Sequence, residues 1–267
     1  MRLSSGIQQF WFVIGSSLFW AALVTGLVVY FSGWQNGVLA AAIMLFFTGW
    51  EVHSIKQKLM RSLPDQLDFQ PVTPNDFAFQ LDVAVLEQQT KELEALGFVH
   101  LQDYALQPTS GLARCFAHPQ HYCFAEVGQI FGADGKMINA NPVILSNLSQ
   151  NWTLAHVRGD LISSSSISLL WRNPQNVGIY HPNTSLEDLL QIHVKFRQKM
   201  VNDLAITVMT DVSWDAYKAG QQQAASDRKH RFQRRSLLIG MVKATLFELN
   251  PTLEWLGNYA PKGSRAV

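Results

Sequence analysis

Residues 3–50 contain no Asp, Glu, Lys or Arg, although charged residues make up 15% of the 267-residue chain. Two apolar runs, residues 10–31 and 34–50, lie in this stretch and are separated by a polar, glycine-containing turn at residues 32–37. A helix needs roughly 20 mostly apolar residues to cross a bilayer core. The missing charge therefore predicts a hairpin of two membrane-spanning helices.

The basic residues that flank this stretch predict its orientation. Arg2 precedes the first run, and Lys56, Lys58 and Arg61 follow the second, whereas the turn between the runs carries no charge. Lys and Arg are retained on the cytoplasmic side of membranes. We therefore expect a protein of the plasma (inner) membrane with both termini in the cytoplasm.

Two other interpretations of the apolar runs compete with the hairpin. The first run could belong to a cleaved signal peptide, with the alanines at 40–42 as the cleavage site, but it is longer than a usual signal-peptide core and a second run follows. The pair could also be a buried helical hairpin of a soluble protein, which an uncharged stretch of this length disfavours. The membrane hairpin remains the prediction.

The chain also lacks a strong net charge and is poor in cysteine. Its formal net charge is +1, which gives no overall field to attract nucleic acid, so a nucleic-acid partner is not expected. Its two cysteines, Cys115 and Cys123, are too few for a disulfide scaffold and should be reduced in the cytoplasm.

The chain outside the hairpin predicts one α+β domain. We expect residues 1–61 to form the hairpin with a juxtamembrane helix, 62–76 to form a proline-containing linker, and 77–267 to form a cytoplasmic domain. This domain should hold a mostly antiparallel sheet with flanking helices, because strand-like runs follow one another with short turn signals. The predicted strands are 99–106, 112–117, 121–131, 143–148, 152–158, 167–171, 177–181 and, less clearly patterned, 204–210. The predicted helices are 79–96, 185–202 and 213–250, the last with a break near Gly220.

Motifs for nucleophilic, phosphate-binding, dinucleotide-binding or zinc-protease chemistry are missing from the sequence. The catalytic candidates that remain are weak. His156 and Arg158 alternate on one predicted strand face and could line a polar pocket, although such a face is more often simply solvated. His193 lies on the apolar face of the 185–202 helix, where a histidine can act as a base but more often packs in the core.

A second group of candidates lies in one predicted hairpin. Cys115, His118, His121 and Cys123 are potential metal ligands, and the two cysteines could face each other across the turn. Their spacing fits no standard zinc module, so buried thiols and solvent-exposed turn histidines are the favoured interpretation, and no metal or other cofactor is predicted.

Basic residues gather near the C-terminus, just before an apolar segment too short to span a bilayer. Such a basic, amphipathic segment can lie on an anionic membrane surface; the alternative is a solvated helix end followed by a core helix. The candidate surface residues are Arg228, Lys229, Arg231, Arg234 and Arg235.

These observations lead to three functional hypotheses. The first is a membrane-anchored cytoplasmic module, not an enzyme, that binds a small ligand or a protein partner, a second copy of the chain included. The second is a membrane-tethered enzyme with a polar site on the sheet face. The third is a metal or redox protein using the 115–123 hairpin. The lipid bilayer is a predicted partner in each case.

Overall fold

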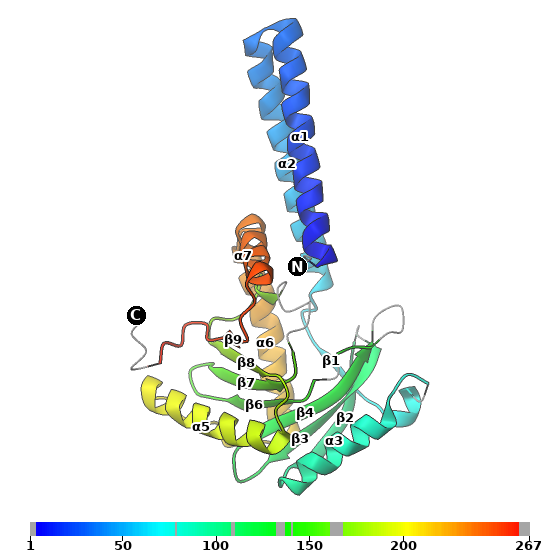
Figure 1. Ribbon diagram of the computed structural model, residues 1–267, viewed down its shortest axis with the longest axis vertical. Helices are drawn as coiled ribbons and strands as arrows, with labels where there is room; N and C mark the ends of the chain where they lie inside the picture. The colour runs from blue at the N-terminus through cyan, green and yellow to red at the C-terminus, as the bar shows by residue number, and fades with distance from the viewer. Residues whose placement is uncertain are drawn as a thin grey trace. The chain divides into compact units, whose positions relative to one another are not determined.

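The computed structural model describes residues 4–77, 79–107, 110–131, 137–139, 141–160 and 168–261. The chain divides into two units (Figure 1). Unit 1 comprises Met1–Pro64, Ser163–Arg172 and Arg228–Pro251, and unit 2 comprises Asp65–Ile162, Asn173–Asp227 and Thr252–Val267. The described residues show an α+β protein with a mostly antiparallel sheet, as predicted.

Unit 1 contains the two predicted apolar helices, α1 (Ser5–Ser32) and α2 (Trp34–Ser62). Both are long and apolar enough to cross a membrane. The turn between them is shorter than predicted, because Gly33 alone separates the helices and its φ of +85° is one that glycine adopts without strain. Gly37 lies so close to Val29 that a Cβ atom there would come within 2.1 Å of its side chain. A small residue thus lets the helices approach closely near the turn.

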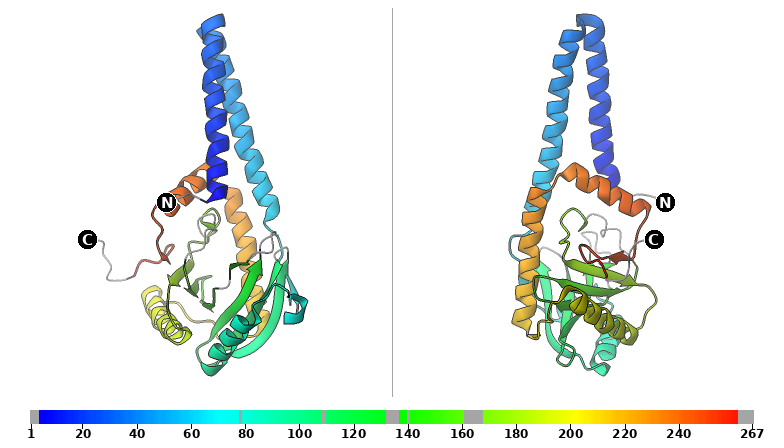
Figure 2. Two further views of the ribbon diagram at one scale, coloured as in Figure 1. Left: turned by 45° about the vertical axis from the view of Figure 1, so that its right-hand side comes forward. Right: turned by 90° about the vertical axis from the view of Figure 1, so that its left-hand side faces the viewer.

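The base of the hairpin packs against α7 (Leu237–Leu249) and the end of α6 (Trp214–Arg234). Figure 2 shows α7 crossing the open end of the hairpin. The Trp11 indole N–H donates to Thr245 Oγ1 at 2.7 Å, and Lys56 Nζ donates at 2.8 Å to the carbonyls of Gln233 and Arg235. These carbonyls lie at the C-terminal end of α6, where a cation is favourable. The core of this region consists of Ile7, Phe10, Ile14, Met60, Leu170, Phe232, Leu237, Met241 and Ala244.

Unit 2 is built on one sheet with the strand order β1-β2-β3-β4-β6-β7-β8-β9, to which β5 is added on β4. All pairs are antiparallel except β7 with β8, which is parallel. The strands are β1 (Asp68–Pro71), β2 (Val99–Gln107), β3 (Ser110–His118), β4 (Cys123–Phe131), β5 (Met137–Asn139), β6 (Val143–Asn147), β7 (Thr153–Arg158), β8 (Asn176–His181) and β9 (Glu254–Trp255). A 3-10 turn, η1 (Pro74–Phe77), follows β1.

Helices cover both faces of this sheet (Figure 1). On one face, α3 (Val83–Ala95) and α5 (Leu186–Leu204) enclose an apolar core that includes Leu93, Phe116 and Leu189. On the other face, the first part of α6 contributes Tyr217 to a cluster with Tyr104 and other aromatic residues. Both α3 and α5 begin with a capping side chain, because Asp82 and Ser185 accept hydrogen bonds from the first turn of each helix.

Several predicted elements differ from the observed ones. Residues 168–171, part of a predicted strand, form a helical turn instead, closed by the Arg172 N–H donating to the Ser168 carbonyl at 2.9 Å; residue 167 lies outside the described residues. Residues 204–210 contribute a single β-bridge, from Val208 to Leu148. Helix α3 begins four residues later than predicted.

The predicted linker and the predicted break in the last helix also differ from the structure. Part of the predicted linker is the edge strand β1, in which Pro71 stands at the last position, where a missing N–H costs little. The predicted helical break near Gly220 is wrong, since α6 continues through it and ends at Arg234. The break lies at Arg235 and Ser236, so the basic and apolar segments belong to different helices.

Candidate functional site

Two of the three catalytic candidates come together under α5, and the third does not. The rings of His156 and His193 are 5.2 Å apart between centroids, and both residues are fully buried. Arg158 instead donates to the Glu92 carboxylate of α3 at 3.0 Å. The predicted polar strand face is therefore divided: His156 belongs to the interior, and Arg158 forms a partly exposed ion pair.

The two histidines form part of a polar cluster buried between α5 and the sheet, which we call the α5 polar cluster. It consists of Ser146, His156, His181, His193 and Arg197. His156 Nδ1 lies 2.9 Å from His181 Nε2, and His193 Nε2 lies 2.8 Å from Ser146 Oγ. Arg197 Nη1 donates to the same Ser146 oxygen at 3.0 Å. Hydrogen bonds thus join β7 to β8 and β6 to α5 inside the core, and the edge-to-face contact of His156 with His193 brings the two pairs together.

Arg197 also stabilises the turn between β3 and β4. Its Nη1 donates to the carbonyl oxygens of His121 and, at 3.3 Å, of Tyr122. Tyr122 has a φ of +49°, a left-handed conformation that is unfavourable for a bulky side chain unless its surroundings hold it. A buried guanidinium that donates to two turn carbonyls supplies that restraint.

Burial disfavours the protonated forms of His156 and His193 in the α5 polar cluster. It lowers the pKa of His156 to about 3, with a further contribution from His181, and it lowers the pKa of His193 well below its usual value. Among the described residues, His156 Nε2 and His193 Nδ1 have no hydrogen-bond partner. Ser146 and His193 have the separation of a nucleophile and its base, but both are closed to solvent and the serine oxygen already accepts from Arg197. The arrangement thus favours a structural role.

The four metal-ligand candidates do not converge. Cys115 and Cys123 lie on opposite faces of the sheet, because Cys115 packs in the cluster with Tyr104 and Cys123 packs under α3 and α5. In the β3–β4 register Cys115 pairs with Glu126, not with Cys123, so the expected alignment of the two thiols is wrong. Within the described residues, no group of three or more His, Cys, Asp or Glu is arranged to hold a metal ion.

The two histidines of that hairpin are close together. The rings of His118 and His121 are 4.4 Å apart between centroids. His118 Nδ1 accepts from the His121 backbone N–H at 3.2 Å, which leaves its Nε2 to donate to the Leu96 carbonyl at 3.1 Å. Both nitrogens of His118 are thus occupied. Burial raises the pKa of the Cys123 thiol to about 12, which disfavours the thiolate that a metal requires.

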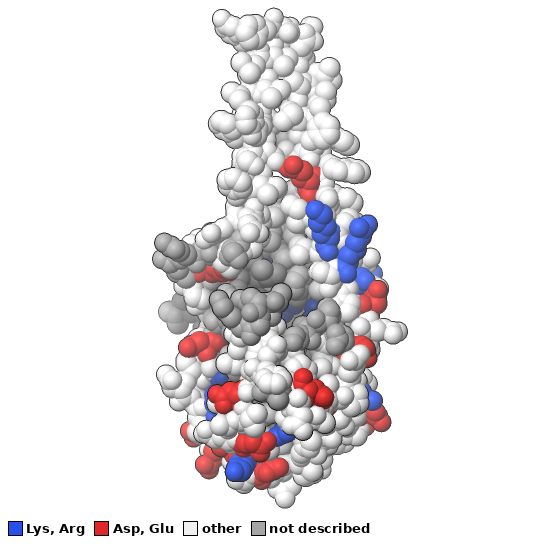
Figure 3. Space-filling view, turned by 90° about the vertical axis from the view of Figure 1, so that its right-hand side faces the viewer, with Lys and Arg blue, Asp and Glu red and all other residues white. Residues whose placement is uncertain are grey.

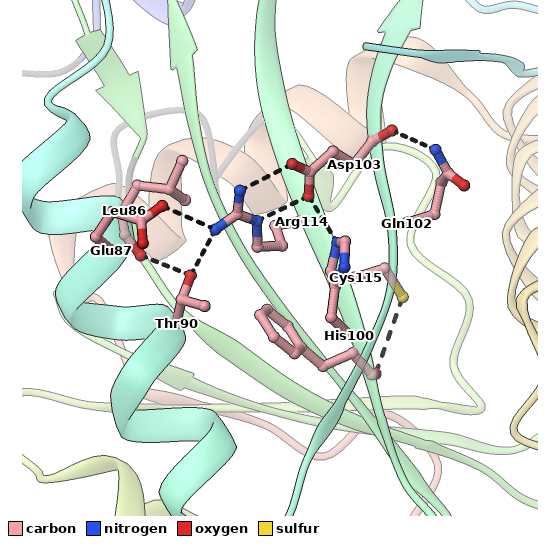
Figure 4. A network of polar contacts seen from close by, with 9 residues as sticks. Leu86, Glu87, Thr90, His100, Gln102, Asp103, Arg114 and Cys115 are labelled. Carbon is pink, nitrogen blue, oxygen red and sulfur yellow. Dashed lines mark hydrogen bonds and ion pairs between the residues drawn. The ribbon is translucent and has the colours of Figure 1, made fainter. Parts of the chain in front are cut away.

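The strand that carries Cys115 also carries a well-formed ion pair (Figure 4). Arg114 donates to both carboxylate oxygens of Asp103, at 2.8 and 2.9 Å, and to Thr90 of α3 at 2.9 Å. Burial alone would raise the pKa of Asp103, but the hydrogen bonds and charge of Arg114, with those of His100, hold it below its usual value. This pair joins β2, β3 and α3, and all of its members already have partners.

An open groove lies between α5, the C-terminal end of α3 and the β3–β4 turn, and we call it the α5 groove. Its volume is about 430 Å³, within the range of small-molecule sites. Leu96, Leu190 and Val194 supply apolar lining; the polar residues that line it are His121, Glu187, Gln191 and Lys195. His121 connects the groove to the α5 polar cluster, since its carbonyl accepts from Arg197.

A smaller cavity of about 130 Å³ lies on the opposite face, between α6 and the strands β6 and β7. Asn147, Thr153 and Gln221 contribute polar groups to its wall. Neither this cavity nor the α5 groove is lined by His156, Arg158 or His193. Of the sequence candidates, His121 lines the α5 groove.

The predicted membrane-surface residues do not form one exposed basic face. Arg228, Lys229 and Arg231 are partly buried along α6, whereas Arg234 and Arg235 are exposed at its end. Burial lowers the pKa of Arg228.

Ser146, His181 and Arg197 were not among the site residues predicted from the sequence. A signal existed for Arg197, which lies four residues after His193 and so shares its helix face. An arginine on an apolar face needs buried acceptors. His181 offered no such signal, because its contact with His156 depends on the parallel pairing of β7 and β8.

Comparison of the chain with protein-family models, with curated proteins and with solved structures gave no match.

Proposed function

We propose that this protein is a membrane-anchored binding module. In this proposal, α1 and α2 span the membrane, and unit 2 binds a small ligand with an apolar body and a polar group on the cytoplasmic side. The observation that carries the binding function is the α5 groove, because it combines apolar lining with charged and amide groups in an open space of about 430 Å³.

The exposed side chains of the hairpin support the anchor. Phe12 is 76% exposed, Phe46 66% and Trp34 69%, which is unfavourable in water but suits lipid. Tyr30 and Trp34 lie beside the turn, at the position where aromatic residues favour the headgroup level. On the face in Figure 3, the outer length of the hairpin shows no charged side chains, and blue side chains appear at its base.

The charges at the base of the hairpin support the orientation. Lys56, Lys58 and Arg61 belong to the last turns of α2, and the exposed Arg234 and Arg235 belong to the same unit. Basic residues next to a span favour the cytoplasmic side. This orientation would place both termini of the hairpin, and the domain that follows it, in the cytoplasm.

The enzyme and metal hypotheses have less support. Within the part of the chain that the structure describes, Ser146 and His193 have the spacing of a catalytic pair, and both are inaccessible to a substrate. The redox hypothesis required Cys115 and Cys123 to share a face, and they do not.

A matched pair of substitutions on α5 tests the proposal. Gln191 lines the groove and Gln198 does not, yet both are exposed glutamines on the same helix, seven residues apart. Full-length protein purified from its own membranes should carry a small molecule in native mass spectrometry. Gln191→Trp should fill the groove and lose that added mass, whereas Gln198→Trp should keep it.

Two results would overturn the binding function. One is an unmodified protein that carries no small molecule, and the other is a Gln191→Trp variant that retains the same added mass as the unmodified protein. Thermal unfolding of both variants checks that the substitutions leave the fold intact, which is expected because both positions are on the surface.

A further inference from the structure

Helix α7 has an apolar face that nothing in the described part of the chain covers. Its buried side, which includes Leu237, Met241 and Ala244, packs against the base of the hairpin. The other side exposes five large apolar residues: Leu238 at 41%, Ile239 at 61%, Val242 at 44%, Leu246 at 61% and Leu249 at 55%. At 3.6 residues per turn these five fall within one arc of about 100°. Helix α7 is therefore apolar on two sides.

Charge is scarce on this helix. Lys243 is the one exposed charged residue between Leu237 and Leu249, and it lies beside the apolar arc. Glu248, the other charged residue, accepts from the backbone N–H of Ser4 at 2.7 Å on the side toward the hairpin. A helix of 13 residues is too short to span a bilayer. Its composition suits a position along the membrane interface, with the lysine reaching the headgroups.

The level at which α7 meets the hairpin identifies what covers it. The hydrogen bond from Trp11 to Thr245 fixes α7 beside the first turns of α1. From Trp11 to Phe31, α1 rises about 30 Å at 1.5 Å per residue. The hydrocarbon core of a bilayer is also about 30 Å thick. When α1 spans the membrane with Phe31 at the outer boundary, α7 lies at the inner boundary.

We propose that α7 lies in the cytoplasmic headgroup region of the bilayer and inserts its exposed face, from Leu238 to Leu249, among the lipids. The inference rests on the proposed membrane anchor and extends it from two helices to three. The hairpin and α7 also share one apolar core at the base of the hairpin. The exposed Arg234 and Arg235, just before α7, complement anionic headgroups.

A protein partner or a second copy of the chain could also cover an apolar face, but lipid fits better. Helix α7 contacts both hairpin helices, whose outward side chains are largely apolar. An occupant other than lipid would have to displace lipid at the level where the hairpin enters the bilayer.

Depth-dependent fluorescence quenching tests the inference. Single cysteines replace Ile239 or Leu246 in the full-length protein, carry an environment-sensitive dye, and are reconstituted in vesicles of phosphatidylcholine and phosphatidylglycerol. Cys115 and Cys123 are fully buried, so the unmodified protein sets the labelling background. We expect dyes at both α7 positions to be quenched by lipids with a nitroxide near the headgroup, at least about twofold more than by one near the tail end.

Two control positions separate this inference from the proposed anchor. Phe19→Cys lies in the middle of α1 and is 64% exposed, so its dye should respond most to the deep quencher. Gln198→Cys on α5 should respond to neither. If Phe19→Cys is quenched but the α7 dyes respond no more than Gln198→Cys, the inference about α7 is overturned and the anchor stands. If Phe19→Cys is also unquenched, the anchor fails with it. Cross-linking between α7 cysteines of two chains, without quenching by lipid, would identify a second copy as the occupant and overturn the lipid contact.

Discussion

Units 1 and 2 place their apolar and polar side chains in opposite ways. The hairpin of unit 1 directs large residues such as Phe46 and Trp34 outward. Unit 2 buries Phe116 completely and also buries polar residues, including His156 and His193. The difference supports the proposed membrane anchor, in which the hairpin meets lipid and unit 2 meets water. Water forces apolar groups inward in unit 2, whereas in lipid helices associate through close packing and not by excluding apolar surface.

The contacts that hold each unit follow the same division. In unit 1, α1 and α2 approach each other where Gly37 meets Val29, and an extensive side-chain core is confined to the base. In unit 2, interlocking side chains fill the space between the sheet and the helices on both faces. The free energy of unfolding of unit 2 should therefore depend strongly on single apolar side chains, and that of the hairpin should not.

The largest expected effect comes from a phenylalanine truncation made in each unit. Phe116→Ala, at a fully buried position, should lower the free energy of unfolding of unit 2 by about 3–5 kcal/mol. Phe46→Ala, at a position 66% exposed, leaves no cavity and should cost less than about 1 kcal/mol in lipid. Denaturant unfolding of the full-length protein in lipid nanodiscs, followed by amide hydrogen exchange, measures both. An equal loss in the free energy of unfolding for the two variants would show that a packed core also stabilises the hairpin.

A smaller effect should follow from pH. His156 and His193 have folded pKa values below the unfolded value of about 6.5, so their contribution to stability is complete above pH 6.5 and is lost as the pH falls. Between pH 7 and pH 5, the unfolded chain takes up protons that the folded chain does not, at a cost of about 2 kcal/mol per histidine. His193→Gln should reduce the pH dependence of the free energy of unfolding by about that amount.

His53 is the matched control for this prediction, because it is an exposed histidine on α2 in unit 1. The free energy of unfolding is measured from unfolding curves at pH 7 and at pH 5. The difference between the two values should be the same for His53→Gln as for the unmodified protein. A pH dependence that His193→Gln leaves unchanged would mean that His193 is not held neutral in the folded state.

Local signals in the sequence were sufficient for the elements they control directly. The uncharged stretch predicted α1 and α2, and the predicted helix at 185–202 corresponds closely to α5. The observed bounds of β2, β3 and β4 agree closely with the predicted ranges, because period-two patterns and short turns are local features of the sequence. The edge strands β1 and β9 were missed, since each is short and is defined by its partner strand.

The candidate site was less predictable than the fold. Strand alternation placed His156 and Arg158 on the same face of the sheet. Whether His156 is buried there depends on the position of α5, which the strand itself does not encode. The metal hypothesis needed the two cysteines on one face, and the register that pairs Cys115 with Glu126 puts them on opposite faces. The length of a turn sets the register between the strands it joins, and a shift of one residue moves each side chain to the opposite face. Site predictions therefore fail where the turn length is uncertain. The α5 groove depends on α3, α5 and a turn together, and no single segment encodes it.

The smallest expected effect concerns how helices begin in the two units. Ser185, the N-cap of α5 in unit 2, accepts from the Asp188 backbone N–H at 3.0 Å and donates to its carboxylate at 2.7 Å. Ser236, the N-cap of α7 in unit 1, makes no side-chain capping bond. Ser185→Ala should therefore cost about 1 kcal/mol of stability. Ser236→Ala should change stability by no more than a few tenths of a kcal/mol, because no capping bond is lost.

Hydrogen exchange of the first-turn amides in each helix, compared with that of the unmodified protein, measures the two cap substitutions. Faster exchange at the start of α5 in Ser185→Ala, with unchanged exchange at the start of α7 in Ser236→Ala, is the expected pattern. If exchange at the start of α7 in Ser236→Ala is accelerated as much as exchange at the start of α5 in Ser185→Ala, Ser236 also acts as a cap. The contrast would then lie in the solvent around each unit and not in how the ends of their helices are stabilised.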